Sequence, residues 1–391
     1  MSKLLSKYLK TTKLETAVVM SKSESINNRD FAQTRVPMIN LALSGSFRGG
    51  LSSGITIFAG PSKHFKTCFG LVMVSAYMRK YPDAVCIFYD NERGLTPSYM
   101  AAWGVDPDRT IHIRTKNIEE IKTDMAKKLD AGVKGEHVIY FIDSIGNAAS
   151  NKEIEDAVKG ESKADMQRAK EIKSFFRIIS PFITELDIPC VAIAHTYKTM
   201  EMYSKDVIGG GTGVMYNCDS AFIIGKRQNK DDKTKELLGY EFVLRVAKSR
   251  YIKEGVEFPV SVTYDEGIDN YTGLFDMAKD LGFVGKMIKD DGKESRDYYQ
   301  RKLLDPETGE LVAISTDQWK VVETSCVDFW KPLFLHQPFI DAVEAKYKLS
   351  EKINVKSDID GLLQEQVGDD LSDEIPMMKV DDTEQDEITE E

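Results

Sequence analysis

The nine residues AGPSKHFKT, at positions 59–67, nearly match the phosphate-binding pattern GxxxxGK[ST]. Gly60, Lys66 and Thr67 stand where the pattern requires them, and Phe65 replaces its second glycine. In such a loop the backbone N–H groups and the helix N-terminus face phosphate oxygens, the lysine pairs with the β- and γ-phosphates, and the hydroxyl binds Mg²⁺. The sequence therefore predicts a site for a nucleoside triphosphate with Mg²⁺. The predicted binding residues are Gly60, Pro61, Ser62, Lys63, His64, Phe65, Lys66 and Thr67.

Phe65 is the departure from the pattern that has to be explained. A glycine at this position avoids a Cβ and permits any backbone conformation. A phenylalanine is tolerated if the backbone is already helical there and the ring points away from the phosphates, because its N–H is unchanged. We therefore expect a working loop with a more crowded approach. The alternative is an ordinary strand-turn-helix connection in which Lys66 stands by chance.

Three further apolar runs end beside side chains that suit phosphoryl chemistry. HVIYFID ends in Asp143, which we expect to hold Mg²⁺ together with Thr67. CIFYD is followed by Glu92, a candidate general base for an attacking water. CVAIA is followed by His195, a candidate sensor of the γ-phosphate. Each has a structural alternative, namely a strand that simply ends in aspartate, an exposed turn carboxylate and a structural histidine.

The segment after His195 is unusually long for a connection within a compact domain. It runs from Thr196 to Cys218 and contains GGGTG at 209–213. Connections beyond about 15 residues are usually functional or disordered. The glycines remove side chains where another backbone, such as a phosphate chain, can approach.

The elements that must position these residues alternate between strands and helices. Apolar runs predict strands at 54–59, 84–90, 110–114, 137–143, 188–194 and 219–225. Helical patterns lie near 67–80, 96–103, 117–131 and 162–186. This alternation predicts an α/β fold, with a mainly parallel twisted sheet and helices on both faces. Two more runs, 240–248 and 257–264, predict an antiparallel extension of the sheet joined through 249–256.

Charge is distributed unevenly along the 391-residue chain. The formal net charge is −11, yet residues 369–391 contain eleven acidic residues and one lysine. The body is therefore nearly neutral, and the overall charge does not argue against a polyanionic partner. Five scattered cysteines indicate a reduced, cytoplasmic protein. No apolar run approaches the ~20 residues that cross a bilayer, so we expect no membrane association.

Together these stretches resemble the RecA-type recombinases, and in particular their phage T4-type branch. The resemblance rests on VPMINLALSG, AGPSKHFKT, CIFYDNERGLTPSYM, VIYFIDS, IPCVAIAHTY, GGGTG, AFIIGKRQ, AKSR and YDEGID. It covers about 35–285 for the wider family and most of the chain for the phage branch. That branch is similar to this chain in carrying a bulky residue where the second glycine of the loop usually stands.

The resemblance implies that the nucleotide is ATP, bound with Mg²⁺. Tyr99 and Tyr264 lie where RecA-type proteins hold the adenine. His195 replaces a glutamine that usually senses the γ-phosphate, and histidine can also donate a hydrogen bond. Lys248 and Arg250 match two lysines that reach a neighbour's ATP, and Arg250 keeps the charge. The alternative is that Lys248 and Arg250 are simply exposed basic residues on a hairpin. The implied catalytic residues are Glu92, Lys66, His195, Lys248 and Arg250.

DNA contacts are implied for the two loops that follow Asp143 and His195, at about 145–165 and 196–217. Arg168, Gly210 and Gly211 match the family best, although Arg168 can equally be a solvated helix residue. Lys198 and Lys205 are added only because phosphate contact favours cations. The implied DNA-binding residues are Arg168, Lys198, Lys205, Gly210 and Gly211.

The implied organisation has four parts. Residues 1–34 form an oligomerisation segment, 35–285 a RecA-like ATPase core, 286–365 a smaller C-terminal module, and 366–391 a disordered acidic tail.

The implied function is homologous recombination by helical filaments on single-stranded DNA. Such a filament pairs with double-stranded DNA, exchanges strands and hydrolyses ATP during phage recombination, repair and replication. We expect a single-strand-binding protein and a recombination mediator as partners, and the host cytoplasm as location. Two rivals share the nucleotide residues, a RecA-fold hexameric helicase and a small-molecule P-loop kinase.

Overall fold

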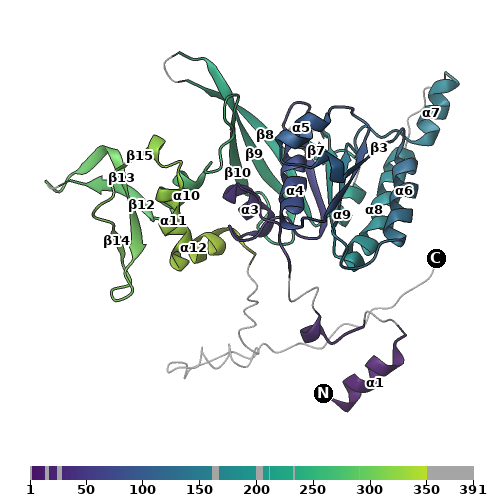
Figure 1. Cartoon of the computed structure of the whole chain (residues 1–391), viewed down its shortest axis with the longest axis horizontal. Helices are drawn as coiled ribbons and strands as arrows, with labels where there is room; N and C mark the ends of the chain where they lie inside the picture. The colour runs from purple at the N-terminus through teal and green to yellow at the C-terminus, as the bar shows by residue number, and fades with distance from the viewer. Residues whose placement is uncertain are drawn as a thin grey trace, which may run out of the picture. The chain divides into compact units, whose positions relative to one another are not determined.

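The mostly parallel sheet expected from the sequence is present in the computed structural model, which describes residues 2–13, 17–23, 29–160, 167–199, 206–210, 212–231, 234–289 and 291–349. Among these residues, nine strands form one sheet in the order β11-β10-β9-β8-β1-β5-β4-β2-β3 (Figure 1). Its bounds are β1 Gly54–Ala59, β2 Val85–Asp90, β3 Thr110–Arg114, β4 Val138–Asp143, β5 Pro189–Ala194, β8 Ser220–Lys230, β9 Leu237–Ser249, β10 Glu257–Thr263 and β11 Gly267–Ile268.

The register of the parallel strands determines where the predicted site residues lie. β1 pairs in parallel with β5 and β8, β5 with β4, and β4 with β2. Asp90 at the end of β2 stands opposite Asp143 at the end of β4. The carboxyl ends of these strands therefore lie along one edge of the sheet, where ligands bind in open α/β folds.

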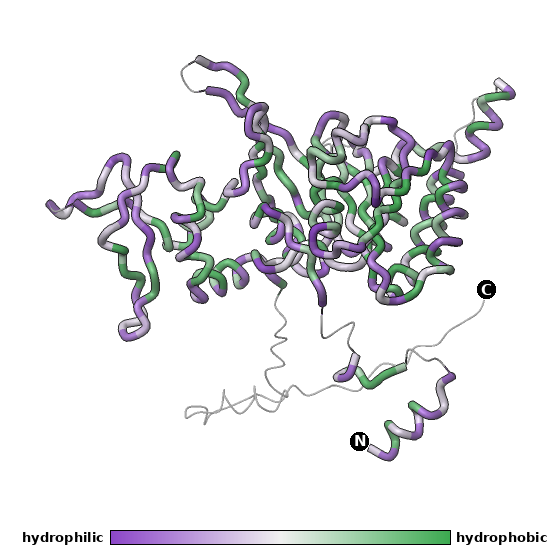
Figure 2. The backbone as a smooth tube through the Cα atoms, viewed as in Figure 1, coloured by the Kyte–Doolittle hydropathy of each residue, from purple (hydrophilic) through white to green (hydrophobic). Residues whose placement is uncertain are grey.

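Helices cover both faces of the sheet, as predicted, and divide its core in two. On one face α3, α4 and α5 pack against Phe58, Phe141 and Phe222. On the other face α6, α8 and α9 pack against Ile57, Tyr140 and other buried side chains. Figure 2 shows the resulting apolar centre of the strands. The helices are α3 Pro37–Ser44, α4 Lys66–Lys80, α5 Pro97–Ala102, α6 Ile118–Asp130, α7 Asn151–Val158, α8 Gln167–Leu186 and α9 Thr212–Asn217.

The predicted antiparallel extension is also confirmed. β10 pairs antiparallel with β9, with Glu257 opposite Arg245. β9 in turn pairs antiparallel with β8, and Figure 1 shows this hairpin continuing past the other strands. The long segment after β5 contains two short antiparallel strands, β6 Thr196–Lys198 and β7 Asp206–Ile208, followed by α9.

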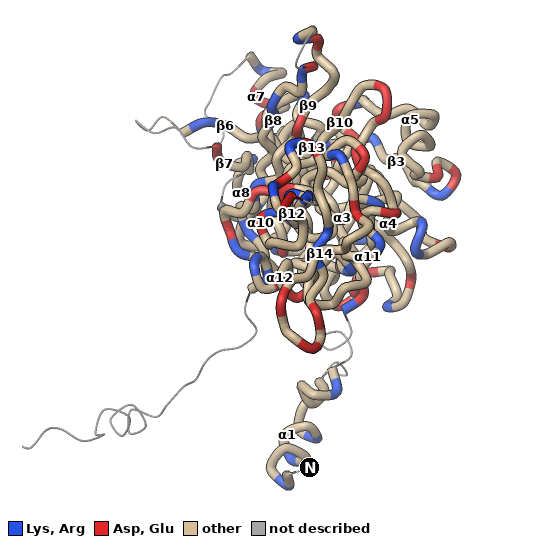
Figure 3. Tube along the Cα trace, turned by 90° about the vertical axis from the view of Figure 1, so that its left-hand side faces the viewer, with Lys and Arg blue, Asp and Glu red and all other residues tan. Residues whose placement is uncertain are grey.

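The C-terminal part contains strands that its charged, turn-rich sequence did not predict. Beyond α10 (Leu274–Asp280), four antiparallel strands pair around β13, and α11 (Val327–Leu335) and α12 (Gln337–Tyr347) follow. Figure 3 shows acidic and basic residues interspersed over this part. The strands are β12 Val284–Ile288, β13 Glu294–Leu304, β14 Leu311–Ala313 and β15 Trp319–Lys320.

A buried ion pair and a shared apolar cluster hold this part together and against the core. Arg301 donates to Asp317 and to the backbone carbonyls of Asp328 and Phe329. Phe334 of α11 lies edge-on to Phe47 of the core, with 5.3 Å between ring centroids. The domain boundaries given above remain predictions, and residues 350–391 lie outside the described part of the chain.

The N-terminal helix α1 (Lys3–Thr11) begins at Ser2, whose hydroxyl accepts a hydrogen bond from the N–H of Leu4. The helix buries none of its residues, and Leu4 and Tyr8 are exposed. Short 3₁₀ turns lie at Met20–Lys22, Pro107–Arg109 and Val321–Glu323. In the part of the chain that the structure describes, no helix is long and apolar enough to span a bilayer.

We predict that Gly70→Ala destabilises the protein, because this glycine of α4 packs directly against Phe141 of β4. A Cβ at Gly70 would lie 2.3 Å from Cε2 of Phe141, which is fully buried. Such overpacking typically costs about 1–3 kcal/mol, more than the better helix propensity of alanine returns. Urea unfolding measures the loss. Gly94→Ala is the matched control: a Cβ there meets nothing within 4 Å. Equal stabilities of the two variants would contradict the close packing.

Candidate nucleotide-binding and catalytic site

Four strand ends bring the predicted catalytic groups together at the carboxyl edge of the sheet. The phosphate loop follows β1, Glu92 follows β2, Asp143 ends β4 and His195 follows β5. The Thr67 hydroxyl donates to Asp143 Oδ2 at 2.6 Å, and His195 Nε2 lies 3.0 Å from Glu92 Oε1. These contacts place the four groups at one edge of the sheet, while their roles remain predictions.

Lys66 begins α4 and lies beneath the loop. Lys66 is only 7% exposed, and its Nζ donates a hydrogen bond to the carbonyl oxygen of Pro61 at 2.8 Å. Burial lowers the pKa of the Lys66 ammonium, while the Glu92 and Asp143 carboxylates oppose that change. This buried cation lies near two carboxylates at a strand-to-helix turn. It is suited to binding an anion that enters the loop.

Asp143 is the group whose surroundings fit a magnesium ion. Within the described residues, its Oδ1 atom is buried and has no hydrogen-bond partner. Burial raises the pKa of Asp143 to about 6, with Glu92 and Asp90 adding to the rise and the Thr67 hydrogen bond opposing it. No group of three His, Cys, Asp or Glu side chains in that part could hold a metal alone. Mg²⁺ commonly uses one or two protein oxygens together with phosphate oxygens, so Thr67 and Asp143 would hold it.

Glu92 is held by three neighbouring donors that all reach the same carboxylate oxygen. Ser144 Oγ and Asn147 Nδ2 donate to Oε1 at 2.6 and 2.8 Å, and His195 Nε2 is the third. The His195 hydrogen bond lowers the pKa of Glu92 most, and Ser144 adds to this against the effect of burial. The carboxylate is therefore ionised and able to accept a proton, and His195 contacts it directly.

The turn that carries Glu92 depends on residues that the sequence analysis missed. Asp90 Oδ1 accepts hydrogen bonds from the N–H groups of Glu92 and Arg93 at 3.0 and 2.7 Å. Asp90 Oδ2 lies 2.8 Å from His112 Nε2 on β3. Asn91 exchanges hydrogen bonds with the backbone of Ser144. An aspartate that ends a buried strand two residues before a reactive carboxylate is the signal that would have found this turn.

Phe65 adopts a conformation different from the one that the sequence analysis allowed for. Its φ of 61° and ψ of 14° are left-handed, not right-handed helical. Its ring stacks on Phe242 of β9, with 4.8 Å between centroids and 16° between planes, and lies edge-on to Phe69 and Trp103. A left-handed non-glycine residue costs about 1–2 kcal/mol, and aromatic contacts of this kind recover about 0.5–1.5 kcal/mol each.

The two tyrosines predicted to hold adenine flank the same aromatic cluster. Tyr99 on α5 is 42% exposed, lies 6.2 Å from Trp103 and has its hydroxyl 3.2 Å from Cys68 Sγ. Tyr264 directly follows β10, is 66% exposed and lies edge-on to Tyr240 of β9. Each tyrosine therefore has one supported side and one accessible side. Both are suited to stacking against a base.

Lys248 and Arg250 lie toward the opposite edge of the sheet from the phosphate loop of their own chain. Lys248 stands opposite Ala221 at the start of β8, and its Nζ donates to the carbonyls of Met215 and Tyr216. Arg250 Nε lies 2.8 Å from Asp219 Oδ1, and the other oxygen of Asp219 accepts from Ile55 N at the start of β1. If these cations act on a phosphate, it must be one bound by another copy.

The predicted DNA-binding residues are only partly brought together. Arg168 near the start of α8 donates to the carbonyl of Gly146. Gly210 has a φ of 102°, and a Cβ there would lie 2.8 Å from Val214 Cγ2, so glycine is required. Lys198 is exposed at the end of β6. Lys205 and Gly211 lie outside the described residues.

A basic groove beside these loops was not found from the sequence. Lys226, Arg227 and Arg245 line a cavity of about 260 Å³ together with Gly225, Val243 and Glu257. Arg245 Nη2 lies 4.0 Å from Asp206 Oδ2 at the start of β7, which places the groove next to the segment after His195. Arg227 stands opposite Glu241 and Arg245 opposite Ile223, on either side of the pair Gly225–Val243, so the two arginines are seen to share a groove only once the β8–β9 register is known.

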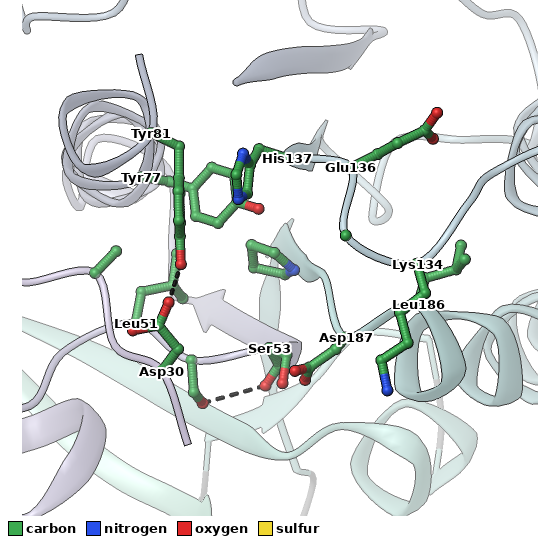
Figure 4. Close-up of a pocket in the computed structure, with 14 residues that line it drawn as sticks. Asp30, Leu51, Ser53, Tyr77, Tyr81, Lys134, Glu136, His137, Leu186 and Asp187 are labelled. Atoms are coloured by element: carbon green, nitrogen blue, oxygen red, sulfur yellow. Dashed lines mark hydrogen bonds between the residues drawn. The ribbon is translucent and has the colours of Figure 1, made fainter. Parts of the chain in front are cut away.

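A second cavity, of about 180 Å³, lies at the amino edge of the sheet (Figure 4). Figure 4 shows the hydrogen bond between Tyr81 and Asp30 at its wall. None of the predicted site residues is among those that line it. It is therefore separate from the catalytic groups described above. Its lining includes Leu51, Ser53, Tyr77, Lys134, Glu136, His137, Leu186 and Asp187.

The fold and the four strand ends define a RecA-like P-loop core. Residues 271–343 match the family model described as "Bacteriophage T4, Recombination and repair protein, C-terminal domain". The recombination and repair protein of Enterobacteria phage T4 is 49% identical over 371 residues, which cover 94% of this chain and 92% of that protein. The chain therefore belongs to the family of the phage T4-type (UvsX) recombination and repair proteins.

Bacterial RecA proteins are more distant relatives. Protein RecA of Streptococcus thermophilus is 25% identical over 244 residues, 61% of this chain and 62% of that protein. Protein RecA of Psychrobacter cryohalolentis is 26% identical over 246 residues, 61% of this chain and 66% of that protein. The match to the phage protein extends well beyond the region shared with RecA, so the UvsX-type branch of the RecA-type recombinases is the family of this chain.

We predict that Asp143→Asn stabilises the protein at neutral pH when Mg²⁺ and nucleotide are absent. The folded pKa of about 6 lies above the ordinary value of 3.8, so ionising this carboxyl costs stability. The cost is absent below about pH 4, grows between about pH 4 and 6, and is complete above about pH 6, where it reaches about 3 kcal/mol at most. Urea unfolding of both proteins across this range measures the difference.

A matched control for this experiment is Asp305→Asn. Backbone N–H groups of Thr308 and Glu307 lower the pKa of Asp305, so ionisation there favours the folded state. The control should lose stability relative to the wild type as the pH rises, the reverse of Asp143→Asn. A stability difference for Asp143→Asn that does not change with pH would contradict the raised pKa.

Proposed function

We propose that this chain is a DNA-dependent ATPase that forms helical filaments on single-stranded DNA and carries out homologous pairing and strand exchange in phage recombination, repair and replication. One observation carries the proposal. The phosphate loop, Glu92 and Asp143 lie at one edge of the sheet, while Lys248 and Arg250 lie toward the other. A site divided in this way is complete only between two copies, which stack head to tail and so generate an open helix or a ring.

Within one such interface we assign a role to each group. The loop N–H groups and Lys66 bind the β- and γ-phosphates of ATP, and Thr67 and Asp143 hold Mg²⁺, which supplies charge neutralisation at the phosphates. Glu92 orients the attacking water and accepts its proton. His195 senses the γ-phosphate, and its hydrogen bond to Glu92 links this contact to the general base. Tyr99 and Tyr264 hold the adenine. Lys248 and Arg250 of a neighbouring copy stabilise the charge that develops on the phosphate.

The link from nucleotide to DNA runs through the segment that follows His195. The carbonyl of His195 accepts a hydrogen bond from Gly209 N at 2.7 Å, and a Cβ at Gly146 would lie 2.8 Å from His195 Cδ2. A movement of this histidine therefore displaces both predicted DNA loops. We assign DNA contact to these loops through Arg168, Lys198, Lys205, Gly210 and Gly211. The basic groove of Arg227 and Arg245 is assigned as a further phosphate contact, so binding should weaken with salt.

The N-terminal segment is assigned to assembly. Helix α1 exposes Leu4 and Tyr8, and none of its residues is buried. An amphipathic helix that buries none of its own residues is suited to docking on an adjacent copy. We also expect a single-strand-binding protein and a recombination mediator as partners, and the host cytoplasm as the place of action.

We predict that single-stranded DNA strongly stimulates ATP hydrolysis by the wild type and that Lys66→Ala abolishes the stimulated rate. Loss of the buried cation removes the grip on the phosphates, and a fall of at least about 100-fold is expected. Steady-state ATPase assays with and without DNA measure this. Lys127→Ala, on the exposed side of α6, is the control and should behave as wild type. A wild-type rate indifferent to DNA would rule out the recombinase.

We further predict that two inactive variants complement each other when mixed. Lys66→Ala lacks the phosphate grip, and Arg250→Ala lacks the group given to the neighbour. In a mixed filament about one quarter of the interfaces combine an intact Lys66 with an intact Arg250, so about one quarter of the wild-type rate returns. The double variant added to wild type is the control. Recovery in the mixture should appear as an increase above either variant alone. If Arg250 acts on the ATP of its own chain, the mixture stays inactive.

A further inference from the structure

A continuous row of aromatic rings crosses the nucleotide site. It links α5, the phosphate loop and strands β9 and β10, and each ring contacts the next. In order, the rings are Tyr99, Trp103, Phe65, Phe242, Tyr240 and Tyr264. The two tyrosines assigned to adenine are therefore the two ends of the row, and Phe65 is in its middle.

Phe65 is the ring that joins the two halves. Toward α5 its centroid lies 5.5 Å from Trp103, which lies 6.2 Å from Tyr99. Toward the sheet it stacks on Phe242 at 4.8 Å, and Phe242 lies 6.1 Å from Tyr240. A glycine at position 65, as in the usual pattern, would separate the α5 half from the β9 half.

A second contact ties the loop to the β9 half. Lys226 on β8 places its Nζ 3.6 Å from the centroid of the Tyr240 ring and donates to the carbonyl of Lys63 at 3.2 Å. Lys63 is itself left-handed, with a φ of 62°. The phosphate loop is therefore coupled to the rings of β9 twice, through the stacking of Phe65 on Phe242 and through the cation–π contact of Lys226 with Tyr240.

We propose that Phe65 is a specificity residue that sets how strongly the base is recognised. Its side chain holds the Tyr99 and Tyr264 platforms at a fixed separation and ties that separation to the loop that grips the phosphates. Phe65 thereby determines both the selectivity for a purine base and the affinity for the triphosphate. This inference rests on the proposed function, since it takes an adenine nucleotide as the ligand.

The unusual backbone of Phe65 is what this role requires. The left-handed conformation of a non-glycine residue carries a cost that the loop avoids with glycine. The ring compensates by stacking on Phe242 and by its edge contacts. The exposed faces of Tyr99 and Tyr264 gain a fixed support, which lowers the entropy that each tyrosine loses when a base stacks on it.

The test compares the binding of Mg·ATP and Mg·CTP to the full chain by calorimetry. The two nucleotides carry the same triphosphate and ribose, so the ratio of their Kd values isolates the base. The wild type should prefer ATP. In Phe65→Leu and Phe65→Gly, both nucleotides should still bind, and the ratio should fall about threefold to tenfold, with most of the change in the Kd for ATP. Phe334→Leu, which removes a ring that contacts Phe47, is the control and should keep the wild-type ratio.

The outcomes separate this inference from the proposed function. If the wild type binds ATP and CTP equally, the assignment of an adenine site is wrong, and the proposed role of the aromatic row is wrong with it. If the wild type prefers ATP and the Phe65→Leu variant keeps the full preference, only the proposed role of the aromatic row is wrong. A parallel loss of affinity for both nucleotides means that Phe65 is merely structural. If the Phe65 variants do not fold, Trp103→Leu breaks the same row from the α5 side and should lower the same ratio.

Discussion

A buried carboxylate with one oxygen that has no hydrogen-bond partner among the described residues is the constraint on which the rest of the site depends. Asp143 ends a strand buried on both faces, and only one of its oxygens is satisfied, by Thr67. Burial raises its pKa, so in water this arrangement costs stability instead of adding to it. This cost in stability is explained if the oxygen without a partner binds a cation that enters the site together with a ligand. Glu92 and His195 follow neighbouring strands at the same edge of the sheet, and Lys66 begins α4 directly after the phosphate loop.

The direction of the strands explains why the predicted groups lie at two different edges of the sheet. The parallel strands concentrate loop, acid and base at their carboxyl ends, while the antiparallel β9 returns toward their amino ends and carries Lys248 there. Strand β9 also carries Phe242, which stacks on the phosphate loop. One strand thus contacts the phosphate loop of its own chain through an aromatic ring and carries a cation near the opposite edge of the sheet.

The strand ends could be predicted because the information is local. GITIFA, CIFYD, HVIYFID and PCVAIA are mainly apolar. His195 directly follows its strand, Asp143 ends its strand, and Glu92 comes two residues after the end of β2, so one edge of the sheet follows from the parallel order. The conformation of Phe65 could not be predicted, because it depends on Phe242, which is distant in the sequence. The strands of the C-terminal part were missed because charged residues interrupt their alternation. Arg301, buried against Asp317, looks like a surface residue until its partners are known.

The central claim is that a triphosphate is gripped beside Lys66 with the Phe65 ring turned aside. The most direct measurement is a structure of the protein assembled on single-stranded DNA with Mg²⁺ and a non-hydrolysable ATP analogue. The account predicts density for the phosphates between Lys66 and Thr67, the Phe65 ring still stacked on Phe242, and Arg250 of a neighbouring copy at the γ-phosphate. A ring that fills the loop, with no ligand density beside Lys66, would contradict it.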